Sequence, residues 1–210
     1  RGALLRLTDE DGSAGWGDCA PLPSGGNAAA VLAALDEHCR RPAGADFSGL
    51  PPEVRWAIET AQADSEARRR GVPLARYFNP AAPLVVAVNA ALGALGNDGC
   101  LARARAAHAQ GFAIGKLKVG VGSVDDELAR LRELHEAAPG LRLRLDANRA
   151  WHDAEARRFL TALADLPIDA VEEPLAAPTP ERLAALQRAL PFAIAVDESL
   201  LRLGADALFA

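Results

Sequence analysis

Short apolar segments that end in a charged residue recur at nearly constant spacing in the second half of the chain. The charged residues at positions 118, 146, 172 and 197 are 28, 26 and 25 residues apart. A strand, a helix and their two connections need about that length in a β/α unit. The pattern therefore predicts consecutive β/α units with parallel strands, although the units share no repeated sequence. The segments are Lys116–Val119, Leu141–Asn148, Ala170–Pro174 and Ala193–Glu198.

Signals for helix starts lie between these segments, as polar caps, a proline at the first helical position or acids in the first turn. An earlier apolar run, Leu84–Asn89, predicts a strand with both faces covered. Together these features predict five β/α units, the last of them incomplete. A closed barrel has eight strands, so we expect the sequence to lack about three units. The helix-start signals are Asn97–Asp98, Ser123–Asp126, Asp153 and Thr179–Glu181.

The first 82 residues show a different pattern, which predicts a separate α+β domain before a barrel domain at 83–210. Two short apolar strands flank turn residues, as in a β-hairpin. A loop rich in proline and glycine and two helices follow. The sequence contains no Met, so we also expect the natural N-terminus to lie before Arg1. The predicted elements are strands at Leu4–Leu7 and Gly15–Cys19, the loop Pro21–Gly26, and helices at 28–39 and 51–70.

Composition excludes several classes of partner. The 210 residues are 50% hydrophobic and 24% charged, with a net charge of −5, as in an ordinary globular protein. Arg68–Arg70 is the largest basic run, which predicts no nucleic-acid partner. No apolar run is long enough for a membrane span. Three scattered cysteines fit a reducing cytoplasm, with each cysteine a small buried side chain.

Three carboxylates share equivalent positions near the ends of successive predicted strands. In a β/α barrel, polar groups at the C-terminal ends of strands form the active site. Asp146, Glu172 and Asp197 would therefore converge, and hard oxygen ligands without His or Cys suit Mg²⁺. A helix cap or a surface ion pair would explain any one of these acids alone. Three acids in phase with the strand repeat favour a metal site.

Two lysines lie on the preceding predicted strand. Alternate strand residues point to the same side, so Lys116 and Lys118 share a face. Each would disfavour the other's charge and lower its pKa, as would a nearby Mg²⁺. A lysine shifted toward its neutral form is a competent general base. Two surface lysines that extend into solvent are the simpler interpretation of such a pair taken alone.

The remaining charged residues suggest supporting roles. None of the four histidines ends a predicted strand, so no histidine base is expected here. Glu173 and Glu198 alternate away from Glu172 and Asp197, which suggests that they hold metal ligands or pair with lysine.

These motifs resemble the enolase superfamily, in its muconate-lactonising-enzyme branch, and are most similar to the o-succinylbenzoate synthases of menaquinone synthesis. The resemblance covers nearly the whole chain, with the motifs in the same order and at similar spacing. It implies an enolase-type (β/α) barrel with an N-terminal α+β capping domain. The motifs are Gly15–Gly17 leading to Pro21–Pro23, Lys116–Lys118, Leu143–Trp151, Glu172–Pro174 and Ile194–Leu200.

The resemblance also implies roles for individual residues. Asp146, Glu172 and Asp197 would bind Mg²⁺, with Mn²⁺ as an alternative. Lys118 would remove a proton α to the carboxylate of a small substrate, and Lys116 would tune this base and help to hold that carboxylate.

The resemblance also gives roles to two further residues and a loop. Asn148 would line the site near the metal, and Arg144 would contact substrate or support a ligand. The loop Pro21–Gly26 would close over the substrate. The family places another lysine on the sixth barrel strand, beyond the last residue of this sequence.

Two other interpretations remain open. Relatives with the same ligands racemise N-succinylamino acids or epimerise dipeptides on this scaffold. A catalytically inactive barrel, or a fragment with a structural role, is an alternative from a different class.

The reaction that the resemblance to the synthases implies is the dehydration of 2-succinyl-6-hydroxy-2,4-cyclohexadiene-1-carboxylate to 2-succinylbenzoate.

Overall fold

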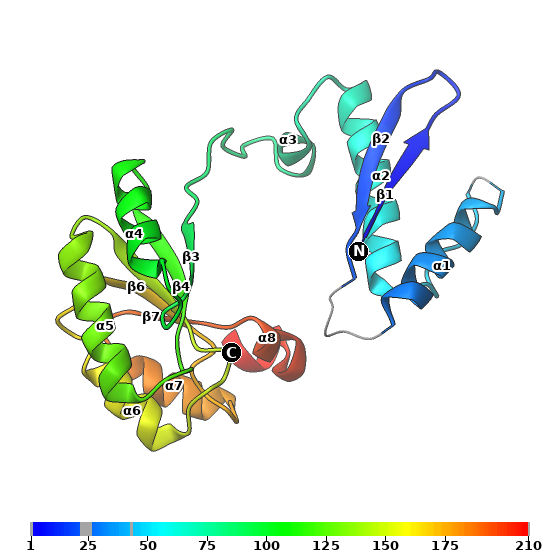
Figure 1. Ribbon diagram of the computed structural model, residues 1–210. Coiled ribbons are helices and arrows are strands. Elements are labelled where there is room, and N and C mark those ends of the chain that lie inside the picture. The colour runs from blue at the N-terminus through cyan, green and yellow to red at the C-terminus, as the bar shows by residue number, and fades with distance from the viewer. Residues whose placement is uncertain (1, 22–26, 43, 210) are drawn as a thin grey trace. The chain divides into compact units, whose positions relative to one another are not determined.

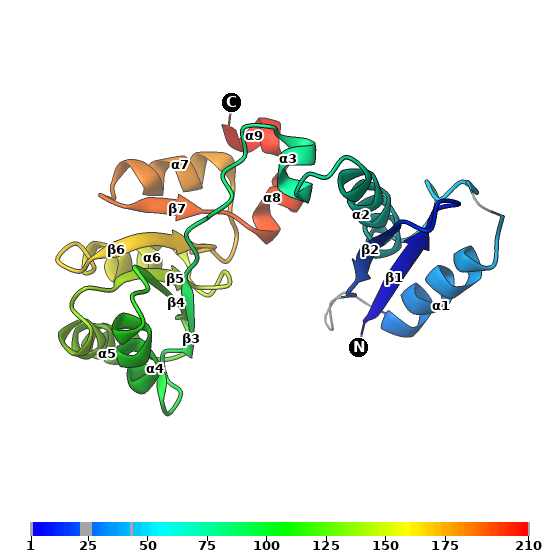
Figure 2. The same ribbon diagram turned by 90° about the horizontal axis from the view of Figure 1, so that it is seen from above.

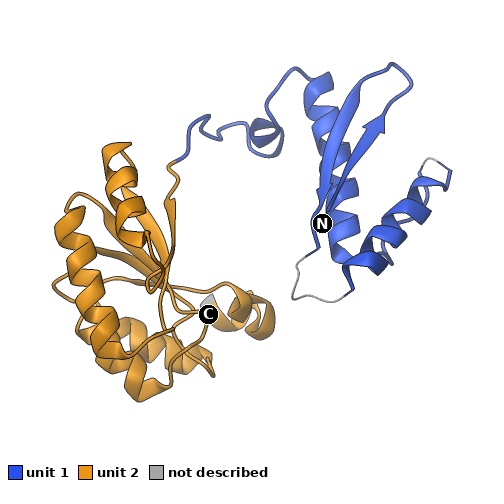
Figure 3. Cartoon of the chain, in the orientation of Figure 1, with its two compact units in different colours: residues 1–86 blue, residues 87–210 orange. Residues whose placement is uncertain are grey.

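A computed structural model describes residues 2–21, 27–42 and 44–209. It divides the chain into two compact units, residues 1–86 and 87–210 (Figure 3). Each unit is considered by itself. The domain division predicted after residue 82 stays a prediction, because compactness alone does not show that either part folds independently.

The first unit is a β-hairpin packed on a long helix (Figure 1). The hairpin is antiparallel, and its strands and turn lie where the sequence predicts them. The first helix covers the predicted range, and the Asn27 side chain caps it by accepting a hydrogen bond from the Ala30 N–H. The short helix after residue 73 was not predicted. The elements are β1 (Ala3–Thr8), β2 (Ala14–Cys19), α1 (Ala28–Cys39), α2 (Pro52–Arg69) and α3 (Leu74–Phe78).

Two glycines allow the second hairpin strand to lie directly on the backbone of α2. A methyl group at Gly17 would lie 1.8 Å from the carbonyl oxygen of Ala57. A methyl group at Gly15 would lie 2.0 Å from that of Ala61. Any side chain at these positions would push the strand off the helix, so the Gly-x-Gly motif is a packing requirement.

The second unit contains five parallel strands in the order β3-β4-β5-β6-β7, which is also their order in the chain. Figure 2 shows the strands side by side, with helices between them in sequence. This is the predicted succession of β/α units. The strands are β3 (Ala90–Ala94), β4 (Ile114–Lys118), β5 (Arg142–Asp146), β6 (Ile168–Glu172) and β7 (Ala193–Ala195). The helices are α4 (Cys100–Ala109), α5 (Val124–Ala137), α6 (Asp153–Thr161), α7 (Pro180–Arg188), α8 (Glu198–Leu203) and α9 (Ala205–Phe209).

The core of this unit lies between the helices and one face of the sheet. Leu143 and Leu145 are fully buried there, with Leu131 of α5 and Phe159 of α6 in the same cluster. Arg144 and Asp146 alternate with these leucines and therefore point to the opposite face. The face that does not carry the helices thus presents charged groups.

Two of the predicted helix starts are confirmed in detail. The Ser123 hydroxyl accepts a hydrogen bond from the Asp126 N–H at the start of α5 (3.2 Å). Thr179 caps α7 in the same way through the Arg182 N–H (3.3 Å), with Pro180 at the first helical position.

The strand predicted at Leu84–Asn89 is wrong. These residues form no strand, and Leu84, Val85, Val86 and Val88 are 64–85% exposed. The strand instead covers Ala90–Ala94, because this segment finds partners on β4, from Ala90 opposite Gly115 to Ala94 opposite Lys118. An apolar run becomes a strand only where a neighbour offers it hydrogen bonds.

The predicted cap at Asn97–Asp98 is also wrong. Helix α4 begins at Cys100 after Gly99, whose φ of +85° closes the preceding turn. Both polar residues lie in that turn, since the Asn97 carbonyl accepts the Cys100 N–H.

Across the described residues, every helix is too short or too polar to cross a membrane.

The contact between β2 and α2 gives a first prediction. Gly17→Ala should lower the free energy of unfolding by about 3 kcal/mol, the upper range for overpacking, because the new methyl group meets backbone that cannot move aside. Gly49→Ala is the matched control, since a methyl group there meets nothing within 4 Å. Urea unfolding of both variants measures the difference, and equal stabilities would contradict the packing requirement.

Candidate active site

The parallel register places predicted site residues in one row across three strands. Lys118 lies opposite Asp146, and Asp146 lies opposite Glu172. All three are the last residues of their strands. The strand repeat in the sequence therefore corresponds to one level at the carboxyl edge of the sheet, where barrel enzymes carry their active sites.

The Lys116 ammonium joins two of the carboxylates. Its Nζ lies 2.7 and 2.9 Å from the two carboxylate oxygens of Glu172 and 3.3 Å from Oδ2 of Asp146. Asp146 is only 5% exposed. Since one cation contacts both acids, their oxygens lie close enough to share a single cationic centre.

The pKa of Lys116 differs from the sequence-based expectation. Burial by itself lowers this pKa, but the hydrogen bond to Glu172 and the attraction of Asp146 and Glu172 outweigh burial and raise it. The prediction of a lowered pKa is therefore wrong for Lys116. The neighbouring carboxylates have a stronger effect than the second lysine.

Lys118 has a different environment on the same face. Its side chain is exposed, and its Nζ donates a hydrogen bond to Oδ1 of Asn148 (2.9 Å). The Asn148 backbone has a φ of +45°, a left-handed conformation that asparagine adopts more readily than most residues. The Asn148 N–H donates to Oδ1 of Asp146 (3.1 Å). Asn148 thus links the exposed lysine to the buried carboxylate.

Asp197 does not lie on a strand, contrary to the predicted strand Ala193–Glu198. Strand β7 ends at Ala195, and Asp197 is the exposed residue before α8. Over residues 2–21, 27–42 and 44–209, no three acidic, histidine or cysteine side chains gather closely enough to hold a metal. Three carboxylates repel one another unless a cation lies between them, and Lys116 provides one for only two of them. The three-acid ligand set stays a prediction.

Arg144 lies two residues before Asp146 on β5, and its guanidinium forms an ion pair with Asp169. Its Nε and Nη2 contact Oδ2 of Asp169 at 2.9 and 2.5 Å, and Arg142 contacts Oδ1 of the same residue at 3.1 Å. Sequence reasoning missed Asp169, although an acid within an apolar strand was a signal. The carboxylate neutralises two arginines in the sheet, so the contact of Arg144 with a substrate remains only a prediction.

Glu127 was also missed. This residue of α5 is 4% exposed, and its carboxylate accepts hydrogen bonds from the N–H groups of Gly120, Val121 and Gly122 at 2.8 to 3.1 Å. These residues form the loop directly after Lys118. The sequence feature that could have indicated this role is an acid near the start of a helix that follows a glycine-rich loop.

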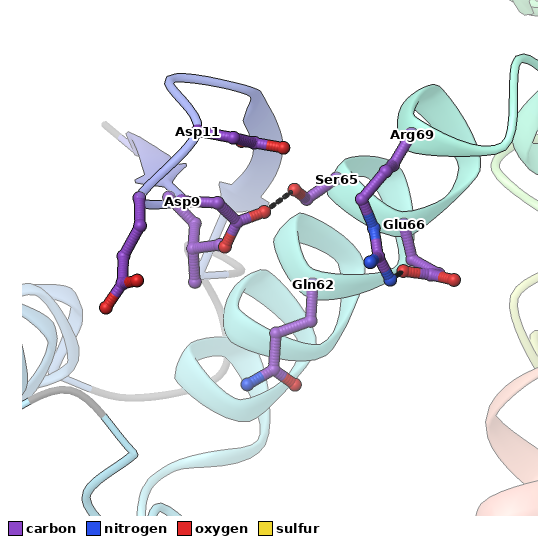
Figure 4. Close-up of a pocket in the computed structure, with 8 residues that line it drawn as sticks. Asp9, Asp11, Gln62, Ser65, Glu66 and Arg69 are labelled. Carbon is purple, nitrogen blue, oxygen red and sulfur yellow. Dashed lines mark hydrogen bonds and ion pairs between the residues drawn. The ribbon is translucent and has the colours of Figure 1, made fainter.

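A pocket of about 520 Å³ in the first unit contains none of the predicted site residues. Figure 4 shows that acids of the hairpin turn and α2 line it, with Ser65 donating a hydrogen bond to Asp9 and Arg69 paired with Glu66. Asp9 and Glu66 thus have partners within the pocket lining. The residues that the sequence predicts for the site lie in the second unit instead.

Comparison with known proteins agrees with this architecture. The family model "Enolase C-terminal domain-like" matches residues 99–205. The o-succinylbenzoate synthase of Thermosynechococcus vestitus is 32% identical over 203 residues, which cover 95% of this chain and 61% of that protein. The hydrophobic dipeptide epimerase of Roseobacter litoralis is 32% identical over 216 residues, with 95% and 62% covered. The mandelate racemase/muconate lactonizing protein of Herpetosiphon aurantiacus superposes with a TM-score of 0.79 at 28% identity, with 93% and 60% covered.

The fold and the charged strand ends define a (β/α)-barrel protein with a polar site at the carboxyl edge of its sheet. The chain belongs to the enolase superfamily, in the branch of the muconate-lactonising enzymes. The predicted fold class, an enolase-type barrel that is incomplete in this sequence, is confirmed. The chain spans about 60% of the length of the first two of these relatives.

Proposed function

We propose that the protein is a Mg²⁺-dependent o-succinylbenzoate synthase. It would dehydrate 2-succinyl-6-hydroxy-2,4-cyclohexadiene-1-carboxylate to 2-succinylbenzoate in the cytoplasm. The observation that carries the proposal is the row of Lys118, Asp146 and Glu172 at one sheet edge. Three relatives with 32–35% identity bear this enzyme's name, which supports the choice of this reaction.

Two of the three proposed donors have the chemistry that suits a divalent cation. Asp146 and Glu172 already share one cationic partner, and they offer only hard oxygen ligands. Asp197, at the start of α8, would supply the third carboxylate. Bound Mg²⁺, or Mn²⁺ in its place, would stabilise the negative charge that develops on the substrate carboxylate when the α-proton leaves.

Lys118 is the proposed base. In its neutral form, its Nζ would take the proton α to the carboxylate, and the hydrogen bond to Asn148 would hold the amine in position. Lys116 stays an ammonium between the acids, where it would add positive charge beside the substrate carboxylate. The 6-hydroxyl group would then leave as water with the proton that Lys118 has taken, and formation of the aromatic ring makes the elimination favourable.

Residue usage supports a specific role for these amines. Lys116 and Lys118 are the only two lysines of the sequence, while its other 21 strongly basic residues are arginines. Arginine does not lose its proton in proteins, whereas lysine can act as a base. Both lysines of the sequence thus lie at the proposed site.

The first unit would act as the capping domain of this site. The proposal gives its loop Pro21–Gly26 the role of closing over substrate, but residues 22–26 lie outside the described part of the chain. A small carboxylate, with no nucleic acid or membrane, is the proposed partner.

Epimerisation is the second candidate, because relatives named hydrophobic dipeptide epimerase are 32–33% identical. Inverting an α-carbon requires acid–base groups on both of its faces. Lys116 and Lys118 lie on one strand, and Lys116 is held by two carboxylates. These two lysines therefore do not supply acid–base groups on both faces of the α-carbon. Exchange of the α-hydrogen of N-succinylamino acids or dipeptides in heavy water would favour this candidate.

The synthase assay is the direct test of the proposal. Purified full-length protein should convert the cyclohexadiene carboxylate to 2-succinylbenzoate, detected by the absorbance of the product. Chelation should abolish turnover and Mg²⁺ should restore it. Absence of turnover with Mg²⁺ present, for both this substrate and the epimerase substrates, would support an inactive barrel.

Replacing the base gives a sharper prediction. Lys118→Ala and Lys118→Arg should both abolish measurable turnover while metal affinity and fold remain, since a general base contributes roughly 10²–10⁴-fold. The arginine variant keeps the charge, which separates proton transfer from electrostatics. Arg132→Ala, at an exposed position on α5, is the control. Near-normal activity of Lys118→Arg would show that the base is misassigned.

The ligand set can be tested without turnover. Asp146→Asn, Glu172→Gln and Asp197→Asn should each weaken metal binding by about 100-fold or more, because even outer partners of metal ligands contribute 10- to 100-fold. Calorimetric titration with Mg²⁺ measures the change. An affinity equal to that of the wild type would remove the substituted residue from the set.

A further inference from the structure

Glu173 is a buried carboxylate that the proposed reaction does not use. Its side chain is only 1% exposed. Oε1 accepts hydrogen bonds from the backbone N–H groups of Asp197 (2.7 Å) and Ser199 (2.8 Å), and Oε2 accepts one from the Ser199 hydroxyl (2.6 Å). These three donors all belong to the segment that carries Asp197.

The Glu173 backbone is fixed as firmly as its side chain. Its N–H donates to the Ala195 carbonyl (3.0 Å), and its carbonyl accepts the Arg149 N–H (2.7 Å). Its φ is +46°, which is unfavourable for a residue with a side chain. Such a conformation persists only where surrounding contacts enforce it, and these positions concentrate at functional sites.

Burying the charged Glu173 carboxylate costs solvation free energy, so packing alone does not account for a glutamate at this position. In the described part of the chain, the ion pairs include none to Glu173, so hydrogen bonds alone stabilise a buried carboxylate. A neutral side chain could fill the same space without that cost. One oxygen of Glu173 accepts two backbone N–H groups and so fixes the backbone on both sides of Glu198.

We propose that Glu173 is a positioning residue that sets the direction of Asp197 toward the metal. The inference rests on the proposed function, in which Asp197 is a metal ligand. Asp197 is exposed and lies beyond the end of β7, so the sheet does not orient it. The hydrogen bonds from residues 197 and 199 to Glu173 provide that orientation instead.

Mn²⁺ affinity of the purified protein, measured by electron paramagnetic resonance, tests the inference. Glu173→Ala should weaken Mn²⁺ binding by about 10- to 100-fold, the usual effect of losing a partner that orients a metal ligand. Glu173→Gln should retain affinity within a few-fold, since its carbonyl oxygen can still accept both backbone N–H groups. In the Asp197→Asn background, Glu173→Ala should weaken binding no further.

Glu127→Ala is the matched control. It removes another buried carboxylate that accepts three backbone N–H groups, but from a loop without a proposed metal ligand. It should lower thermal stability and leave Mn²⁺ affinity unchanged. Equal weakening by Glu127→Ala and Glu173→Ala would show general structural damage and overturn the inference.

The other outcomes separate the inference from the proposed function. Wild-type affinity in Glu173→Ala, with weakened binding in Asp197→Asn, overturns the inference alone. Unchanged affinity in Asp197→Asn overturns both the inference and the proposed ligand set. If Glu173→Ala does not fold, Glu173→Asp decides, because it keeps the charge but withdraws the acceptor oxygens from the backbone N–H groups of Asp197 and Ser199. A loss of about threefold or more supports the inference, and wild-type affinity overturns it.

Discussion

The candidate site depends on the register of the parallel strands. Because β4, β5 and β6 end at one level, Lys118, Asp146 and Glu172 lie in a row without any loop to place them. A shift of one residue in any strand would turn its charged end toward the leucine core. The buried leucines that alternate with these charges therefore fix the chemistry as well as the fold.

Electrostatic interactions then determine which charged partners the residues at these strand ends have. Two carboxylates at neighbouring strand ends need positive charge, and Lys116 supplies it from the adjacent strand. The same attraction raises the pKa of Lys116, which favours the ammonium form over the free amine that could accept a proton. Lys118, bound instead to the neutral amide of Asn148, is the better candidate for proton transfer. Different partners thus separate the roles of two lysines on one strand.

Much of the second unit could be predicted from the sequence, because alternation and spacing are local properties of strands. The strand ends at Lys118, Asp146 and Glu172 follow from that pattern. The strand at Leu84–Asn89 failed because an apolar run does not reveal whether a partner strand lies beside it. Asp169 and Glu127 were missed for a similar reason. Their roles depend on arginines and backbone N–H groups that only the folded chain brings to them.

Glu127 and Glu173 show how the chain fixes loops that the sheet cannot hold. Each buries a carboxylate and accepts three hydrogen bonds from a neighbouring loop, one after Lys118 and one around Asp197. A glycine-rich loop, or a strand that ends early, has few side chains with which to pack. A buried acid can order such a backbone because loop conformations that do not supply its hydrogen-bond donors would leave a buried carboxylate without partners. Such conformations are therefore unfavourable. The precision of a site at the end of a sheet therefore depends on buried acids as well as on the strands.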